Sequence, residues 1–411
     1  MKAKSFFDAW NSFFFAEESP IPLALFRILY GIMVIATSLL LRPSWMAWYG
    51  PHAWISLPTM HVIEPGPRLS LFAVIPQNNF WVHALFWVLL ASALCLTVGF
   101  FTRMSTLIVF LCLTSIDQRN LFILNGGDTF LRLAGFFLIF APAGAALSID
   151  RLIRIWRGRE DAEIQPRRPW AQRMIQFELA ILYFSSFCWK VSGTPWVQGT
   201  ALYYVYHVDE LQRFPLPSWL LRPTMLKLES WFALALEFSL GLLIWVRELR
   251  YYLLTLGLMF HLTLEYSLNV PMFQWDVLSA YVLFIDSADL ERAWHWIRVR
   301  VVPHLGQPVT VIYDRSSPRI QRIANLLVAV DVFDRLSLIN SHDWHDSRPR
   351  YNISARDFRN HLLVATESAA RSGREALRAV ARVVPLLWPI AFGLMIQRLF
   401  TLATSTDSNA S

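Results

Sequence analysis

Cysteine is scarce in this sequence, with 3 residues in 411. Cys95, Cys112 and Cys188 all lie inside apolar runs, and no two of them have CxxC spacing. This argues against a disulfide framework and against a zinc site. Gly-rich phosphate loops, the nucleophile elbow of serine hydrolases and the HExxH zinc motif are also absent. We therefore predict no metal site.

Charged residues are few as well, at 16% of the chain against ~25% in a typical soluble domain. Hydrophobic residues make up 55%, and the mean hydropathy is +0.39. This composition indicates an integral membrane protein. The formal net charge is +7, but most arginines lie in loops between apolar runs, where they control topology. We therefore predict membrane lipid as a partner and no nucleic acid.

Apolar stretches fill the first two thirds of the chain, and they predict an all-α polytopic membrane protein with a bundle of about eight transmembrane helices. A further stretch near 382–403 predicts a ninth, C-terminal transmembrane helix. The first eight stretches are approximately 20–41, 79–101, 104–122, 128–147, 171–190, 229–246, 250–267 and 272–287.

Arginine positions predict the orientation of these helices. The loop 150–173 is the most basic loop between two stretches and should be cytoplasmic. The N-terminus, the segment 246–250 and the basic segment after the eighth stretch then fall on the same side. We therefore predict a multi-pass protein of the inner (cytoplasmic) membrane with a cytoplasmic N-terminus. Lys190 would lie at the extracytoplasmic end of the fifth stretch.

Four motifs carry a resemblance to a known family. They are LFRILYG at 25–31, SIDQRNLFILNGGDTFLRL at 115–133, YFSSFCWKVSGTPWVQGTALYY at 183–204 and FHLTLEYSLNVPMFQWDVLSAY at 260–281. Together they resemble the HTTM (horizontally transferred transmembrane) domain, which is related to vitamin K-dependent gamma-carboxylase. The resemblance covers roughly residues 6–290. Its most specific part is Lys190 followed by a Gly-containing turn, Trp196 and Gly199.

The resemblance implies that Lys190 is a catalytic base. In the carboxylase, the lysine of this stretch activates the vitamin K hydroquinone, which leads to carboxylation of a glutamate side chain. The resemblance thus implies a quinone or hydroquinone cofactor in a lipid-accessible cavity near the extracytoplasmic leaflet. A lysine at the boundary of lipid and water is partly desolvated, which favours a neutral amine that accepts a proton. The alternative is a snorkelling lysine with its ammonium in water.

Further polar residues are candidates for cofactor contacts. The turn at 125–127 would expose backbone N–H groups at a helix start, where a ligand oxygen can bind, although Asp128 would compete for them as a cap. We predict that the cofactor contacts Arg119, Asn120, Asn125, Gly126, Gly127, Asp128, Trp196 and His261.

Several of the charged residues inside the stretches need partners, because a charge in hydrocarbon is costly. Asp128 and Arg132 are four apart and predict an internal ion pair. His261 and Glu265, also four apart, predict a hydrogen-bonded structural pair or, alternatively, a proton relay. Glu237 has no local partner, and Arg27 is a candidate for a distant one.

The residues after the bundle have a different pattern. Residues 309–340 predict a strand, an amphipathic helix and a second strand, a small cytoplasmic α/β segment. It resembles the thioredoxin-like DCC family, but Ser317 and Ile320 stand where that family has its two cysteines. Without thiols there is no thiol–disulfide exchange. We predict a bundle over 1–290, a linker with this degenerate segment over 291–375, and a transmembrane helix with a tail over 376–411.

These observations support two functional hypotheses. In the first, Lys190 acts as a base on a quinol-like cofactor in gamma-carboxylase-like oxidation or carboxylation, with a secreted peptide or a membrane protein as partner. In the second, the protein is a non-enzymatic membrane scaffold, receptor or accessory subunit. The turn 124–128 lacks the histidine that supports the lysine in the carboxylase, which favours the second hypothesis.

Overall fold

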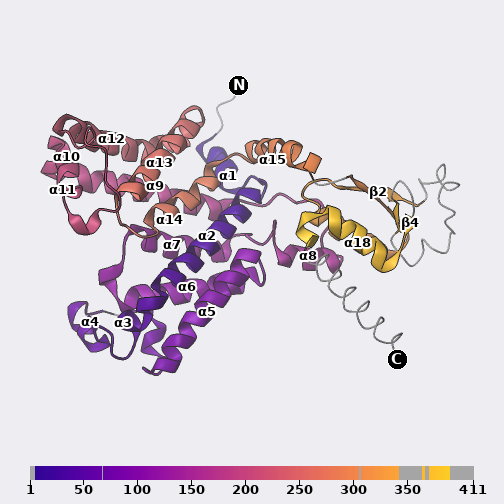
Figure 1. Cartoon of the computed structure of the whole chain (residues 1–411), viewed down its shortest axis with the longest axis horizontal. Coiled ribbons are helices and arrows are strands. Elements are labelled where there is room, and N and C mark those ends of the chain that lie inside the picture. Colours follow the sequence, from indigo (N-terminus) through magenta and orange to yellow (C-terminus); the bar gives the residue numbers. More distant parts are fainter. Residues whose placement is uncertain (1–4, 67, 305–306, 342–362, 366–369, 389–411) are drawn as a thin grey trace, which may run out of the picture. The chain divides into compact units, whose positions relative to one another are not determined.

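The computed structural model describes residues 5–66, 68–304, 307–341, 363–365 and 370–388. The chain divides into two compact units, one of residues 1–150 and 165–287 and one of residues 151–164 and 288–411. In Figure 1 the labelled strands all belong to the second unit, whereas the described part of the first unit consists of helices and their connections.

The described part of the first unit is built from seven long helices and several short ones. The long helices are α2 (Ile21–Leu41), α5 (Asn79–Val98), α6 (Thr102–Arg119), α7 (Gly126–Phe140), α9 (Trp170–Val191), α12 (Pro223–Leu242) and α13 (Arg247–Ser267). The short ones include α1 (Phe6–Phe15), α3 (Trp45–Tyr49), α4 (Leu57–Ile63), α10 (Thr194–Gln198), α11 (Ala201–Val205) and α14 (Phe273–Ser279).

Three helical segments of the described chain are long and apolar enough to cross a membrane. They are Ile21–Tyr49, Asn79–Val98 and Pro223–Trp245. The chain is therefore a membrane protein, and the eightfold count stays a prediction. The predicted eighth stretch is not a single α-helix, because it consists of the seven-residue α14 and a 3-10 helix at Ala280–Phe284.

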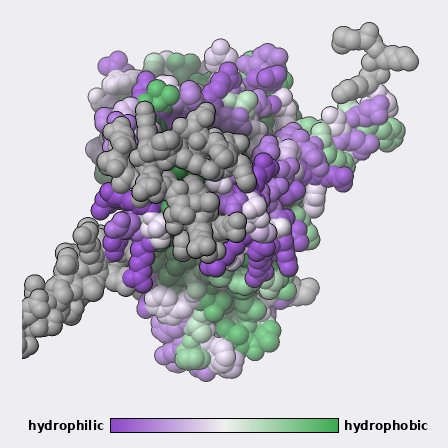
Figure 2. All heavy atoms as spheres, turned by 90° about the vertical axis from the view of Figure 1, so that its right-hand side faces the viewer, coloured by the Kyte–Doolittle hydropathy of each residue, from purple (hydrophilic) through white to green (hydrophobic). Residues whose placement is uncertain are grey.

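Apolar side chains lie on the outside of these helices. On α5, for example, Trp87, Leu94 and Val98 are exposed. Figure 2 shows hydrophobic residues at the surface, most of them toward the bottom of the face it draws. An apolar surface of this kind fits contact with lipid.

The helix α2 packs against α5 at the centre of the first unit. Phe26, Tyr30 and Val34 of α2 are completely buried. A Cβ atom on Gly31 would lie 2.2 Å from Thr97 Oγ1 of α5, so only glycine allows this close approach. Small residues at helix crossings are typical of membrane proteins.

Arg27 is fully buried in this core and binds backbone carbonyls. Its Nη1 donates to Ala143 O at 3.0 Å and to Ala146 O at 3.3 Å. Its Nη2 donates to Leu147 O at 2.6 Å and to Thr97 O at 3.3 Å. The suggestion that Arg27 pairs with Glu237 is therefore wrong.

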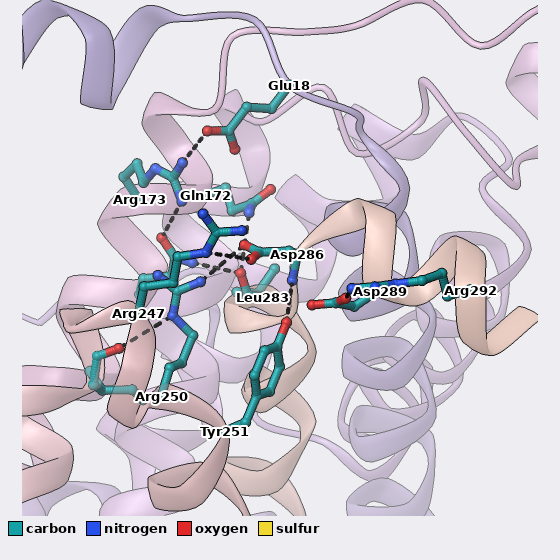
Figure 3. Close-up of polar contacts among 12 residues, drawn as sticks. Glu18, Gln172, Arg173, Arg247, Arg250, Tyr251, Leu283, Asp286, Asp289 and Arg292 are labelled. Carbon is teal, nitrogen blue, oxygen red and sulfur yellow. Dashed lines mark hydrogen bonds and ion pairs between the residues drawn. The ribbon is translucent and has the colours of Figure 1, made fainter.

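A polar cluster joins α9, α13 and the end of the first unit (Figure 3). Arg250 Nη1 of α13 lies 3.0 Å from Asp286 Oδ1, and Arg173 of α9 forms an ion pair with Glu18. The side chain of Gln172 donates to Leu283 O at 3.4 Å. All of these charges come from the segments that the arginine distribution assigns to the cytoplasmic side.

The second unit contains the predicted strand–helix–strand unit. The strands β1 (Val309–Tyr313) and β2 (Leu336–Asn340) are parallel, with Val309 opposite Leu336, and α16 (Pro318–Val330) connects them. The strands β3 (Leu363–Ala365) and β4 (Ala370–Arg371) extend the sheet in antiparallel fashion, in the order β2-β1-β3-β4.

Helices complete this second unit. They are the part of α8 (Ile149–Trp156) after Asp150, most of α15 (Ser287–Val301) and the amphipathic α18 (Gly373–Val383). The core of the unit combines Val311, Leu327, Val364 and Val380, from β1, α16, β3 and α18. Most of the predicted ninth transmembrane helix, residues 389–403, lies outside the described residues, so that prediction stays open.

Replacing Arg27 with leucine should destabilise the first unit by about 3 kcal/mol, because four carbonyl groups lose a buried charged donor. The measurement is thermal unfolding of the purified protein in detergent. The exposed Arg103, replaced in the same way, is the control and should change stability little. Equal effects of the two substitutions would contradict a structural role of the Arg27 contacts.

Candidate functional site

Lys190 lies in the last turn of α9 and forms an ion pair with Glu237 Oε1 of α12. The two helices approach closely at Gly241, where a Cβ atom would lie 2.9 Å from Phe184 Cβ. The lysine side chain is 25% exposed and that of Glu237 only 6%. Ser186 Oγ also donates to Glu237 Oε1, at 3.2 Å. The partner of the mid-helix glutamate is thus Lys190.

The second carboxylate oxygen of Glu237 has a different environment. Oε2 is buried and accepts no hydrogen bond from the described residues. A buried oxygen with unused lone pairs is costly in an apolar environment. Among the described residues, Glu237 Oε2 is therefore a free proton-acceptor position directly beside the lysine.

Trp196 covers the ammonium group of Lys190. Its ring centroid lies 4.8 Å from Nζ, a cation–π distance. The tryptophan is placed by α10, whose C-cap residue is Gly199 with φ +75°. A Cβ atom on Gly199 would lie 2.3 Å from Lys227 Cγ, so glycine is needed for both the backbone conformation and the space. The lysine–turn–tryptophan motif therefore encodes one local structure.

His261 belongs to a separate buried network. Its Nδ1 lies 2.5 Å from Gln274 Oε1, and its Nε2 lies 2.7 Å from the Tyr183 hydroxyl, which lies 2.7 Å from the Tyr281 hydroxyl. Because Gln274 Oε1 is an acceptor, we assign the proton to Nδ1, and Nε2 then accepts from Tyr183. All four side chains of this hydrogen-bond network therefore have a partner.

The predicted His261–Glu265 pair is wrong. Glu265 forms an ion pair with Arg213, in the loop before α12. Four-residue spacing puts His261 and Glu265 on one face of α13, but it does not make them partners. His261 is buried, whereas Arg213, the partner of Glu265, is exposed. Glu265 therefore takes its partner from the surface. The relay alternative for His261 stays a prediction.

The turn before α7 is a capping box. Asn125 Oδ1 accepts from Gly127 N at 2.7 Å, and Asp128 Oδ2 accepts from Asn125 N at 2.8 Å. The protein itself thus uses backbone donors of this turn that the sequence predicts for a ligand. Arg132 pairs with Asp117 of α6 at 3.2 Å, so the predicted Asp128–Arg132 ion pair is wrong. Asp128 is turned back toward the helix start by its capping role.

The two glycines of this turn allow close packing against α14. A Cβ atom on Gly126 would lie 3.1 Å from the Phe273 ring, and one on Gly127 would lie 2.8 Å from Asp276 Oδ2. Since α14 also carries Gln274, it connects the turn to His261. These predicted residues therefore lie in neighbouring parts of the helical unit.

Arg119 and Asn120 are buried at the end of α6. Asn120 Oδ1 accepts from Phe122 N at 3.1 Å and caps the short helix that follows. Arg119 Nε and Nη1 and Asn120 Nδ2 have no hydrogen-bond partner among the described residues. Their predicted contact with a cofactor stays a prediction.

A cavity of about 270 Å³ lies beside this turn. Tyr49, Asp117, Asn125 and Asp128 contribute to its wall, together with apolar residues of α2, α3 and α6. Lys190 does not line this cavity. The predicted site residues therefore divide between the lysine pair with Trp196 and the region around the turn.

Three residues of these contacts, Glu237, Tyr183 and Gln274, are not among the predicted site residues. Glu237 is a mid-helix carboxylate without a local partner in the sequence, and this is the signal that could have paired it with Lys190. Tyr183 and Gln274 carried no such signal, because single tyrosines and glutamines are common. In the part of the chain that the structure describes, no group of three His, Cys, Asp or Glu side chains could hold a metal ion.

Comparison with known proteins gives one match. A model of the HTTM domain family matches residues 15–288, about two thirds of the chain. No curated protein and no solved structure matches.

The Asp117–Arg132 pair can be tested with a double-mutant cycle on thermal unfolding. Asp117→Asn and Arg132→Leu should each destabilise the protein, and the pair should show a coupling energy of about 1–3 kcal/mol because both side chains are largely buried. The matched cycle uses Asp128→Asn with Arg132→Leu, and we expect a clearly smaller coupling. A coupling energy that is larger for Asp128 and Arg132 than for Asp117 and Arg132 would support the Asp128–Arg132 ion pair instead.

Proposed function

Because this chain belongs to the HTTM domain family, we propose that its helical unit acts on a quinol-like, lipid-soluble molecule through the pair Lys190–Glu237. The observation that carries the proposal is the environment of the carboxylate. Glu237 Oε1 is held by Lys190 and Ser186, whereas the buried Oε2 has no partner among the described residues. This arrangement fits a molecule that brings a hydroxyl group.

A quinol, when bound, supplies an acidic O–H group and reducing electrons. The proton is accepted at Glu237 Oε2, which turns the carboxylate into a carboxylic acid. Lys190 keeps its positive charge and is then free to stabilise the negative charge that the proton leaves behind. No net charge is created in the apolar environment, because the ammonium only exchanges one anionic partner for another. In this form of the proposal Glu237 is the base, and Lys190 stabilises the anion that forms.

Access from the bilayer is supported by the surroundings of Lys190. Trp189, Val191 and Val197 are large, apolar and exposed. A lipid-soluble molecule would reach the ammonium group along this apolar surface. The distribution of arginines assigns this end of α9 to the extracytoplasmic side of the inner membrane. We further propose that the cofactor also contacts residues around Asp128. The reaction would oxidise or carboxylate a second substrate, and the partner would be a secreted peptide or a membrane protein.

A second candidate function is non-enzymatic. Lys190 and Glu237 neutralise each other, and an ion pair that only holds α9 against α12 would have the same form. In the second unit, Ser317 stands at the N-cap position of α16 and Ile320 is buried. These are the two positions at which the resemblance to the DCC family would place reactive cysteines. A scaffold, receptor or accessory subunit would keep these features for packing alone.

The base hypothesis is tested by variants of the pair. Lys190→Ala and Glu237→Gln should each reduce the rate at which dissolved dioxygen oxidises a reduced naphthoquinone by about 10²–10⁴-fold, since the first removes the charge beside the proton acceptor and the second removes the acceptor itself. Lys190→Arg keeps the positive charge and should reduce the rate less than Lys190→Ala. The rate is measured with the purified protein in lipid nanodiscs. If all three variants fold and keep the full rate, Lys190 and Glu237 have no chemical role.

Lys227→Ala is the matched control. Lys227 also lies over a tryptophan ring, that of Trp231, at 4.8 Å, but it forms none of the ion pairs found among the described residues. Its replacement should leave the rate unchanged.

Extraction of lipids from the purified protein separates the two functions. Enrichment of a quinone over the surrounding membrane, lost in Glu237→Gln, is expected for the first function. A quinone content equal to that of the bulk membrane, in a protein that shows no quinol oxidation, would favour the scaffold. The measurement is mass spectrometry of the extracted lipids, normalised to phospholipid.

A further inference from the structure

The helix α15 is unusual because it has no buried residue along its 15 positions. Helices of this length are marginal in water and normally depend on packing. Large apolar side chains nevertheless lie on its surface: Trp296 is 58% exposed and Val299 57%. Contact with a partner other than the described residues would account for these exposed apolar side chains.

One side of α15 is held by its own unit. Trp294 Nε1 donates to Val332 O at 3.1 Å, and its ring packs against Phe333 with the centroids 5.1 Å apart. Arg298, on the same side, forms an ion pair with Asp334. These contacts fix the rotation of the helix about its axis.

The other side combines positive charge with apolar surface. Arg292, Trp296, Val299 and Arg300 follow the spacing i, i+4, i+7 and i+8, which places them on one face. Arg292 pairs with Asp289 and has a side chain that is 80% exposed. The Arg300 guanidinium lies 3.5 Å from the centroid of the Trp296 ring. We call these four residues the outer face of α15.

The position of α15 in the chain places its start next to the membrane unit. It begins at Ser287, directly after Asp286, which Arg247 and Arg250 of α13 bind in the cluster of Figure 3. The arginine distribution assigns this end of α13 to the cytoplasmic side. A helix that leaves a bilayer there starts at the height of the lipid headgroups.

We propose that the outer face of α15 binds the surface of a membrane containing anionic phospholipids. Tryptophan prefers the interfacial region, where its ring is in apolar surroundings and its N–H in polar ones. Arginine binds phosphate groups with several parallel hydrogen bonds. A helix with both residue types on one face and no long apolar run lies on a membrane and does not cross it. The second unit would thereby be held at the bilayer surface through α15.

The test is hydrogen–deuterium exchange of the full chain in nanodiscs, read from peptides that cover residues 287–304. Exchange should be about tenfold slower in nanodiscs containing phosphatidylglycerol than in nanodiscs of phosphatidylcholine alone. The double variant Arg292→Gln/Arg300→Gln should lose this difference. Arg319→Gln/Arg322→Gln, which removes the same charge from exposed positions of α16, is the control and should keep it.

Equal exchange in both lipids would overturn the proposal. So would slowing that appears only after another protein is added, because the outer face would then be a protein interface. A loss of the lipid effect in both double variants would also contradict it, since general charge attraction and not the outer face would be responsible. The thermal transitions of both variants are compared with the parent protein, so that unfolding is recognised.

Discussion

The contacts of Arg27 with four backbone carbonyls determine how the central helices meet. A charge inside a membrane bundle must find its partners within the protein, because hydrocarbon provides none. Arg27 takes Thr97 O from the last turn of α5 and three carbonyls from the turn after α7. A Cβ atom on Gly99 would lie 2.6 Å from Nη1, so the chain leaves α5 through a glycine at this point. One side chain on α2 thus holds the ends of two other helices.

The same requirement explains other polar contacts of the helical unit. Asp117 binds Arg132, and His261 is enclosed by Tyr183 and Gln274. These groups are satisfied by partners on other helices, and each contact fixes a helix pair. Glu178 and Glu265 also have buried carboxylate oxygens without a hydrogen-bond partner among the described residues, as Glu237 does. What differs at Glu237 is that its unused oxygen belongs to a carboxylate that binds a lysine. The functional proposal depends on this difference.

Sequence reasoning was most successful where local chemistry decides the structure. The apolar helices, the capping role of Asp128 and the unit of β1, α16 and β2 follow from residue patterns within short segments. It was wrong where partners come from distant segments. Spacing by four predicted Asp128 for Arg132 and Glu265 for His261, but the actual partners lie on other elements of the chain. Which helices become neighbours depends on the packing of the whole bundle. Residue spacing within one helix does not predict it.

Comparison of two ion pairs of the helical unit, Lys190–Glu237 and Arg132–Asp117, shows why Lys190 is the better candidate for chemistry. The side chains of Arg132 and Asp117 are 21% and 6% exposed, and those of Lys190 and Glu237 are 25% and 6% exposed, so burial does not distinguish the pairs. Their cations do. Arginine stays charged in proteins and binds carboxylates as a rigid planar group, whereas lysine is a compact charge on a flexible chain that can follow a moving anion. An arginine pair suits a fixed helix contact. A lysine beside a half-used carboxylate retains the freedom that proton transfer needs, and this distinction remains even if the natural ligand is not a quinol.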